Sequence, residues 1–84
     1  MSKTITVQDC LVLQDRFSKY TESAEQHQFP MLFMIDIMMQ KTVDKILKQG
    51  SVQNQKDTRA MFRSVLRVIG EDYSEYEEQE EESP

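Results

Sequence analysis

The sequence predicts an all-α protein: a small three-helix bundle that dimerises and ends in a disordered acidic tail. Three observations lead to this prediction. Apolar residues recur at helical spacing in three segments, helix-breaking residues separate those segments, and half of the last fourteen residues are glutamate. We therefore expect a helical domain over residues 1–70, with helices at about 6–28, 30–49 and 54–69, and a disordered acidic tail over residues 71–84.

The first helix is indicated by its cap and by its apolar stripe. Thr6 followed by Asp9 has the spacing of a capping box, in which the two side chains bond free backbone N–H groups of the first turn. Pro30 disfavours helical geometry at the residue before it, so the helix is expected to stop near Gln28. Alternating steps of three and four residues place five positions on one face: Cys10, Leu13, Phe17, Tyr20 and Ala24.

The second and third helices follow from the residues that begin and end them. Pro30 suits the first turn of a helix, and Gly50 suits the left-handed residue that ends one. Ser51, Asn54 or Asp57 could cap the third helix, and Gly70 is expected to end it. The apolar members of the third helix again have helical spacing: Met61, Phe62, Val65, Leu66, Val68 and Ile69.

The first half of the second helix is apolar on almost every side, which implies packing on two or more faces. A domain this small buries little core, so self-association is a natural source of stability. We expect this segment at the centre of a homodimer, with burial in an ordinary core as the alternative. Asp36 within it is expected to pair with a base such as Arg16 or Arg63. The candidate protein interface consists of Met31, Met34, Ile35 and Met38.

Charge is sorted along the chain: residues 1–40 sum to −2, residues 41–70 to +5 and residues 71–84 to −8. The bases form helical stripes that could contact phosphates or an acidic partner, or could be ordinary solvated faces. These candidate contacts are Lys41, Lys45, Lys48, Lys56, Arg59, Arg63 and Arg67. The tail could dock on this basic surface or on a partner, or could act only as a solubiliser. Its candidate docking residues are Glu77, Glu78, Glu80, Glu81 and Glu82.

Catalytic and cofactor sites are disfavoured by the residue counts. Cys10 and His27 are the only residues of their types and would lie about 25 Å apart on one helix. The two glycines have helix-ending contexts, which leaves no phosphate-binding loop, and no metal-ligand spacing occurs. We therefore expect no enzyme activity and no cofactor. The longest apolar run is too short to span a membrane, and a single cysteine fits a reducing compartment, so a cytoplasmic protein is expected.

Three functions are compatible with these features. The first is a non-enzymatic regulator or adaptor that acts by binding another protein, and the apolar surplus of the second helix favours it. The second is a nucleic-acid-associated accessory protein, in which the basic stripe of the third helix contacts phosphates and the acidic tail modulates the affinity. The third is an acidic mimic that occupies the nucleic-acid-binding surface of a target protein.

Overall fold

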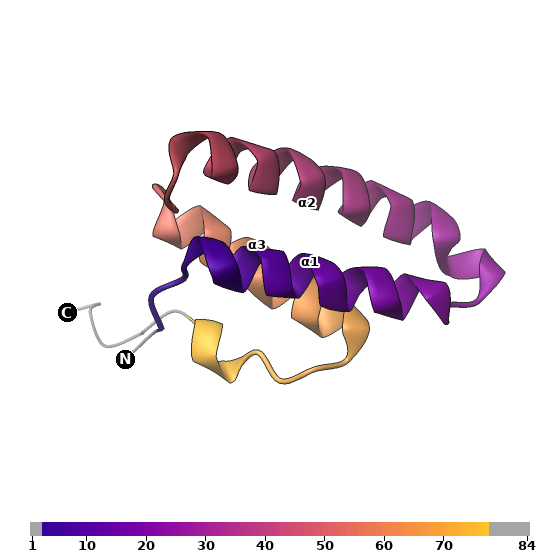
Figure 1. The fold of residues 1–84 in the computed structure, drawn as a ribbon. Helices are drawn as coiled ribbons and strands as arrows, with labels where there is room; N and C mark the ends of the chain where they lie inside the picture. Colours follow the sequence, from indigo (N-terminus) through magenta and orange to yellow (C-terminus); the bar gives the residue numbers. More distant parts are fainter. Residues whose placement is uncertain (1–2, 78–84) are drawn as a thin grey trace.

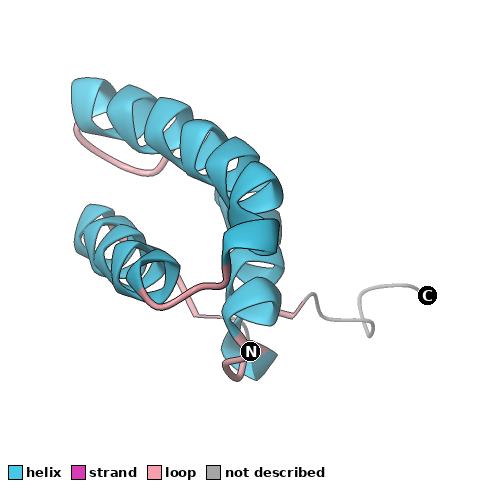
Figure 2. Ribbon diagram, turned by 90° about the vertical axis from the view of Figure 1, so that its right-hand side faces the viewer, coloured by secondary structure: helices cyan, strands magenta, loops and turns pink. Residues whose placement is uncertain are grey.

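The chain folds into three antiparallel helices. The computed structural model describes residues 3–77, with α1 (Val7–Glu22), the 3-10 turn η1 (Gln26–Gln28), α2 (Phe29–Gln49), α3 (Gln55–Ile69) and the 3-10 turn η2 (Ser74–Tyr76) in chain order. α1 and α3 run in one direction and α2 runs in the other (Figure 1). Helices and loops account for all of residues 3–77, without a strand (Figure 2), which confirms the predicted all-α class. Among these residues, no helix has both the length and the apolar character needed to cross a membrane.

The helix ends match the capping signals in the sequence. The Asp9 N–H donates to Thr6 Oγ1 at 3.1 Å and the Thr6 N–H donates to Asp9 Oδ2 at 3.0 Å, which completes the expected capping box. Asn54, one of the three candidate caps, accepts a backbone N–H of the first turn of α3 at 3.0 Å. Gly50 and Gly70 end α2 and α3 with φ angles of 80° and 77°, a left-handed conformation that glycine adopts without steric cost.

α1 ends six residues earlier than expected, at Glu22 rather than near Gln28. The Ser23 hydroxyl donates to the Tyr20 carbonyl at 3.0 Å, and the Glu25 N–H donates to the Gln28 side chain at 3.1 Å. These side chains take up backbone groups that a continuing helix would have used. The chain therefore reverses through η1 before α2 begins.

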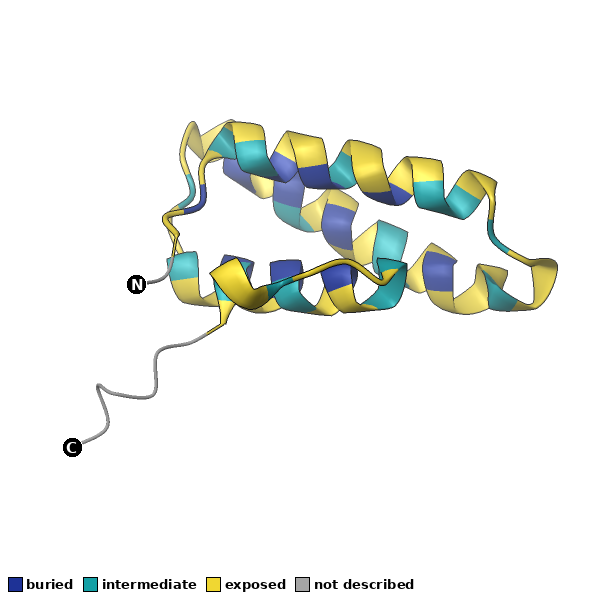
Figure 3. Ribbon diagram, turned by 90° about the horizontal axis from the view of Figure 1, so that it is seen from below, coloured by how far each residue is buried: buried dark blue, intermediate teal, exposed yellow. Residues whose placement is uncertain are grey.

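The core is one apolar cluster to which all three helices contribute. The buried residues face inward along each helix when the bundle is seen from below (Figure 3). α1 packs against both other helices, whereas α2 and α3 touch each other least. The bundle is therefore least closed between α2 and α3. The buried apolar residues are Ile5, Cys10, Leu13, Phe17, Leu32, Met39, Val43, Ile46, Met61, Phe62, Val65 and Leu66.

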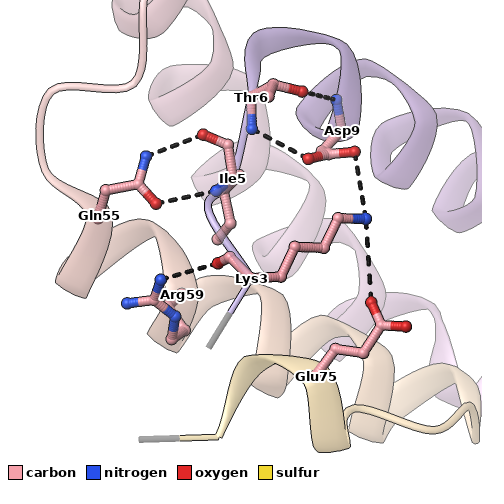
Figure 4. A network of polar contacts seen from close by, with 7 residues as sticks. All are labelled: Lys3, Ile5, Thr6, Asp9, Gln55, Arg59 and Glu75. Carbon is pink, nitrogen blue, oxygen red and sulfur yellow. Dashed lines mark hydrogen bonds and ion pairs between the residues drawn. The ribbon is translucent and has the colours of Figure 1, made fainter. Parts of the chain in front are cut away.

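The segment before α1 is held in place by α3. The Gln55 side chain makes two hydrogen bonds to the backbone of Ile5: its Nε2 donates to the carbonyl at 2.8 Å, and its Oε1 accepts the N–H at 2.9 Å (Figure 4). One turn further along α3, Arg59 Nη2 donates to the Lys3 carbonyl at 2.9 Å. Ile5 is only 2% exposed, so these contacts hold an apolar residue of the N-terminal segment in the core.

The segment after α3 folds back onto the bundle, although disorder is expected from residue 71 onward. Tyr73 and Tyr76 are half-buried against the core, and the ring centroids of Tyr76 and Phe62 lie 4.9 Å apart. Arg63 Nη1 donates to the Tyr76 carbonyl at 2.8 Å. Residues 71–77 therefore pack against the helical bundle. The disorder expected for residues 78–84 lies outside the described residues.

Candidate protein-interaction site

The outward face of α2 carries most of the exposed apolar side chains. Among residues 3–77, nine large apolar side chains are exposed, and seven of them belong to α2. Met34 is 72% exposed and Phe33 is 65% exposed. Single exposed apolar residues are common on soluble proteins, whereas a contiguous group of them makes a candidate interaction site. The seven residues are Phe29, Met31, Phe33, Met34, Ile37, Met38 and Leu47.

Three methionines and three lysines form one line along this face. Their spacing alternates between three and four residues, which keeps side chains on one stripe of a helix. All six side chains are exposed. α2 therefore presents an apolar half followed by a cationic half on the same side. We call this line the methionine–lysine seam, and it consists of Met31, Met34, Met38, Lys41, Lys45 and Lys48.

Three of the four predicted interface residues lie on the seam, and the fourth does not. Met31, Met34 and Met38 are exposed, whereas Ile35 is half-buried and packs against the core. Ile35 follows Met34 directly, so it is rotated by about 100° around the helix, toward the core side. Ile35 therefore contributes to the packing of the bundle rather than to the exposed face.

A groove of about 470 Å³ runs between α2 and α3 beside the seam. Its α2 wall includes Met38, Thr42 and Lys45, and its α3 wall includes Ala60 and Ser64. Its lining comes from α2, α3 and the loop between them, without a residue of α1. Since two seam residues also line the groove, the seam and the groove form one continuous surface.

The basic stripe of α3 is largely occupied by the chain itself. Arg59 and Arg63 are half-buried and donate to backbone carbonyls in the N-terminal and C-terminal segments at 2.9 and 2.8 Å. Arg67 holds its guanidinium 5.6 Å from the centroid of the Tyr73 ring. Lys56 is exposed, with no hydrogen bond or ion pair to another described residue. Two of the four predicted phosphate contacts on α3 are thus engaged in holding the ends of the folded unit.

The lysines of α2 are in a different situation. Lys41, Lys45 and Lys48 are all exposed, and none forms an ion pair with another residue in the range 3–77. Asp44 is the only acid in this half of the helix, and it is exposed as well. The positive charge that is available to a partner therefore lies on α2 more than on α3.

Two of the acidic residues that follow α3 contact bases of the bundle. Glu71 forms an ion pair with Arg16, and a Glu75 carboxylate oxygen lies 3.9 Å from the Lys3 amine (Figure 4). Exposed ion pairs of this kind add little to stability. Glu77 is the last described residue. The predicted docking residues Glu78, Glu80, Glu81 and Glu82 lie outside the described residues, so tail docking stays a prediction.

Asp36 has no basic partner among the described residues, contrary to expectation. The residue is half-buried, and its Oδ2 accepts a hydrogen bond from Gln40 Nε2 at 2.7 Å, one turn further along α2. Of the two expected partners, Arg16 pairs with Glu71 and Arg63 bonds a backbone carbonyl. A neighbouring amide and access to water therefore accommodate the carboxylate.

The residues that could support covalent chemistry are not brought together. Cys10 is 1% exposed; burial raises the pKa of its thiol, and the neighbouring Asp9 carboxylate raises it further. A buried thiol with a raised pKa is a poor nucleophile. His27 is exposed in η1, beyond the opposite end of α1. Within residues 3–77, no group of three or more side chains is placed to hold a metal ion.

Four of the seven exposed apolar residues of α2 are absent from the predicted interface: Phe29, Phe33, Ile37 and Leu47. Phe33 and Ile37 lie beside the seam and are 65% and 39% exposed. A helical wheel centred opposite Leu32 and Met39 identifies Phe33 and Ile37, but the sequence does not reveal that Leu32 and Met39 face the core.

The chain matches no protein-family model, and no curated protein or solved structure matches it.

Proposed function

We propose that the protein is a non-enzymatic regulator or adaptor that acts by binding another protein through the outward face of α2. The observation that carries this proposal is the exposure of Phe33 and Met34, at 65% and 72% of their surfaces. Removing apolar surface from water is favourable by about 25 cal/mol per Å², so a bare face of this kind gains stability when a partner covers it. A second copy of the chain is one such partner.

The chemistry of the seam suits protein recognition. Methionine side chains are long, unbranched and polarisable, so they adapt to the shape of an opposing surface. The seam continues from its methionines into Lys41, Lys45 and Lys48, which offer ammonium groups without partners among the described residues. An apolar contact flanked by charge gives both affinity and orientation. A partner should therefore combine an apolar surface with an adjacent acidic one.

The two other candidate functions have less support. Binding of nucleic acid by α3 would have to displace Arg59 and Arg63 from the backbone carbonyls that they bond. An acidic mimic needs carboxylates fixed at regular spacing, for example on a continuation of α3. That helix ends at Ile69, and Gly70 turns the chain away from the helix axis. The acids that follow it in the described chain are therefore not arranged along the helix.

Photo-crosslinking in the cells that make the protein tests this proposal. Benzoylphenylalanine replaces Phe33 in one variant and Gln8, an exposed polar residue of α1, in the matched control. We expect adducts of discrete mass from position 33 and none from position 8. A variant that yields no protein adduct from position 33 would contradict the proposal, because a covered face must place another protein within reach of the probe.

A further inference from the structure

We propose that the partner of the methionine–lysine seam is a second copy of the chain, whose α2 packs antiparallel across the first. This inference rests on the proposed function, since it names the partner of the same surface. A two-fold dimer interface brings one patch against itself, so the patch must be self-complementary. The order of residues along the seam provides this property: three methionines are followed by three lysines.

The apolar half sets the register of the two helices. With the two-fold axis beside Met34, Met31 lies level with Met38 of the second copy, and the three methionines of each copy overlap fully. Phe33 and Ile37 flank this layer on both copies. A shallow crossing angle of about 20°, as in coiled coils, keeps seams of this three-and-four spacing in contact along their length. The most exposed apolar residues of each chain are then covered.

The cationic half reaches past the second copy's α2. At 1.5 Å per residue, Lys45 lies about 16 Å from the axis, whereas the second copy's α2 begins about 8 Å from it. Lys45 and Lys48 therefore lie past the first residue of the second copy's α2, at the end of the bundle where the hairpin from α1 to α2 lies. The ammonium groups of one copy thus meet the acidic end of the other.

Two exposed carboxylates lie at this end of the bundle: Glu22 is the last residue of α1, and Glu25 lies in the hairpin. Glu22 forms no ion pair with another residue in the range 3–77, and the contact of Glu25 is with His27 at 4.0 Å. The two-fold axis repeats the match, so each end of the dimer pairs two lysines with two glutamates. The net charge of −5 on each chain opposes association only weakly, because salt screens charges separated by more than about 8 Å.

The same charges exclude a parallel arrangement. Parallel α2 helices in register would place each lysine of the seam beside the same lysine of the second copy. Asp44 would be the only acid near these lysines on α2. Like charges placed across an interface are unfavourable, and this repulsion is how many helical pairs select their orientation. The antiparallel arrangement is therefore the one that buries the methionines and pairs the lysines at the same time.

Disulfide formation between single introduced cysteines tests the orientation. In a Cys10→Ala background, Met34→Cys places two thiols close to the axis, so mild oxidation should convert the chain into a covalent dimer. Lys48→Cys places its thiols about 40 Å apart, so the same oxidation should leave the chain monomeric. Equal cross-linking at both positions indicates a parallel pair and overturns the proposal, as does the absence of cross-linking at position 34.

A charge exchange tests the predicted lysine–glutamate contacts. Sedimentation equilibrium of the full chain gives the dimer dissociation constant. Lys45→Glu with Lys48→Glu should raise it by about tenfold or more, and Glu22→Lys with Glu25→Lys should do the same. The quadruple variant should return to within about threefold of wild type. All of the substituted side chains are exposed, so circular dichroism should show an unchanged fold. A quadruple variant no tighter than either double variant overturns the proposed contacts.

The two proposals fail in different ways. A wild-type chain that is monomeric at all concentrations, while position 33 still cross-links to a protein of another mass, overturns the second copy as partner and leaves the proposed function standing. A monomeric chain without any adduct from position 33 overturns both. Adducts at twice the chain mass, lost in the Lys45→Glu and Lys48→Glu variant, support both.

Discussion

Arg63 holds the backbone of Tyr76: its Nη1 donates a hydrogen bond of 2.8 Å to the Tyr76 carbonyl oxygen. The residue before Arg63, Phe62, contacts the Tyr76 ring with a centroid distance of 4.9 Å. Adjacent residues of α3 thus bind the polar backbone and the apolar ring of the same C-terminal residue. This relationship makes residues 71–77 part of the folded unit rather than the start of a tail.

Tyr76→Ala should lower the free energy of unfolding by about 2 kcal/mol, since the half-buried ring loses its contact with Phe62. Ser74→Ala is the matched control, because Ser74 is exposed and its hydroxyl bonds only to Asp72, and it should change stability by less than about 0.5 kcal/mol. Urea unfolding followed by circular dichroism measures both. Equal stability of Tyr76→Ala and wild type would show that the segment does not pack as described.

Gln55→Ala should lower the free energy of unfolding by about 1–3 kcal/mol, because it leaves the N–H and the carbonyl of Ile5 without the two hydrogen bonds that Gln55 supplies. Gln53→Ala serves as the control. Its side chain is exposed and bonds only to Ser51, so we expect little change. The same urea titration gives both values, and an equal effect of the two substitutions would speak against the role of Gln55.

Asp9 should make stability depend on pH in the acid range. Partial burial pushes the pKa of Asp9 upward, but the Thr6 hydrogen bonds and the Lys3 ammonium outweigh it, so the pKa lies below its ordinary value of 3.8. A depressed carboxylate pKa stabilises the fold above pH 3.8, and this contribution is lost as the pH falls through the folded-state pKa.

Asp9→Asn should therefore be destabilising at neutral pH, by less than about 1 kcal/mol because water still screens the half-buried carboxylate, and its effect should vanish in strong acid. Thermal unfolding of wild type and Asp9→Asn, measured from neutral pH to strong acid, gives the difference in stability. A difference that grows as the pH falls would have the wrong sign for a depressed pKa.

Cys10 should react slowly with Ellman's reagent while the protein is folded, since its thiol is 1% exposed and burial raises its pKa. We expect a rate lower than that in denaturant by about a hundredfold or more. Lys48→Cys in the Cys10→Ala background provides an exposed thiol for comparison and should react at nearly the denatured rate. Rapid labelling of native Cys10 would mean that α1 opens frequently or packs differently.

Deletion of residues 78–84 separates protein binding from the nucleic-acid alternative. It removes four glutamates and leaves Tyr73 and Tyr76 in place, whereas deletion from residue 71 would also remove core contacts. We expect negligible binding of a fluorescent oligonucleotide before and after the deletion. Binding that appears on deletion and weakens with salt, with a log–log slope of about −3 to −4, would support the nucleic-acid role instead.

The features that the sequence predicts correctly are those decided within one helical turn. The capping box of Thr6 and Asp9 and the left-handed ends at Gly50 and Gly70 depend on local hydrogen bonds and local sterics. The end of α1 is also set by local bonds. The sequence prediction attributes it to Pro30, but Ser23 and Gln28 end the helix earlier, because their side chains bond the backbone. A helix-breaking residue alone therefore does not show where a helix ends, because nearby side chains can bond the backbone and end it earlier.

The features that escape prediction depend on residues distant in the chain. Composition suggests a solvated segment after Gly70, but Arg63 and Phe62 hold Tyr76 from more than ten residues away. The exposed face of α2 also depends on residues distant in the chain. A segment that is apolar on all sides does not reveal which side will face the core, and the packing of α1 against α2 decides that Met39 is buried and Met34 exposed.

The mass of the chain in solution, measured by multi-angle light scattering over a concentration series, tests the pairing of two α2 seams most directly. Wild type should reach twice the chain mass of 9.9 kDa at the highest concentrations of the series. Met34→Glu, which puts a charge at the centre of the apolar half, should give 9.9 kDa, and Gln8→Glu on α1 should leave the dimer intact. A wild-type mass of 9.9 kDa at every concentration would contradict the pairing.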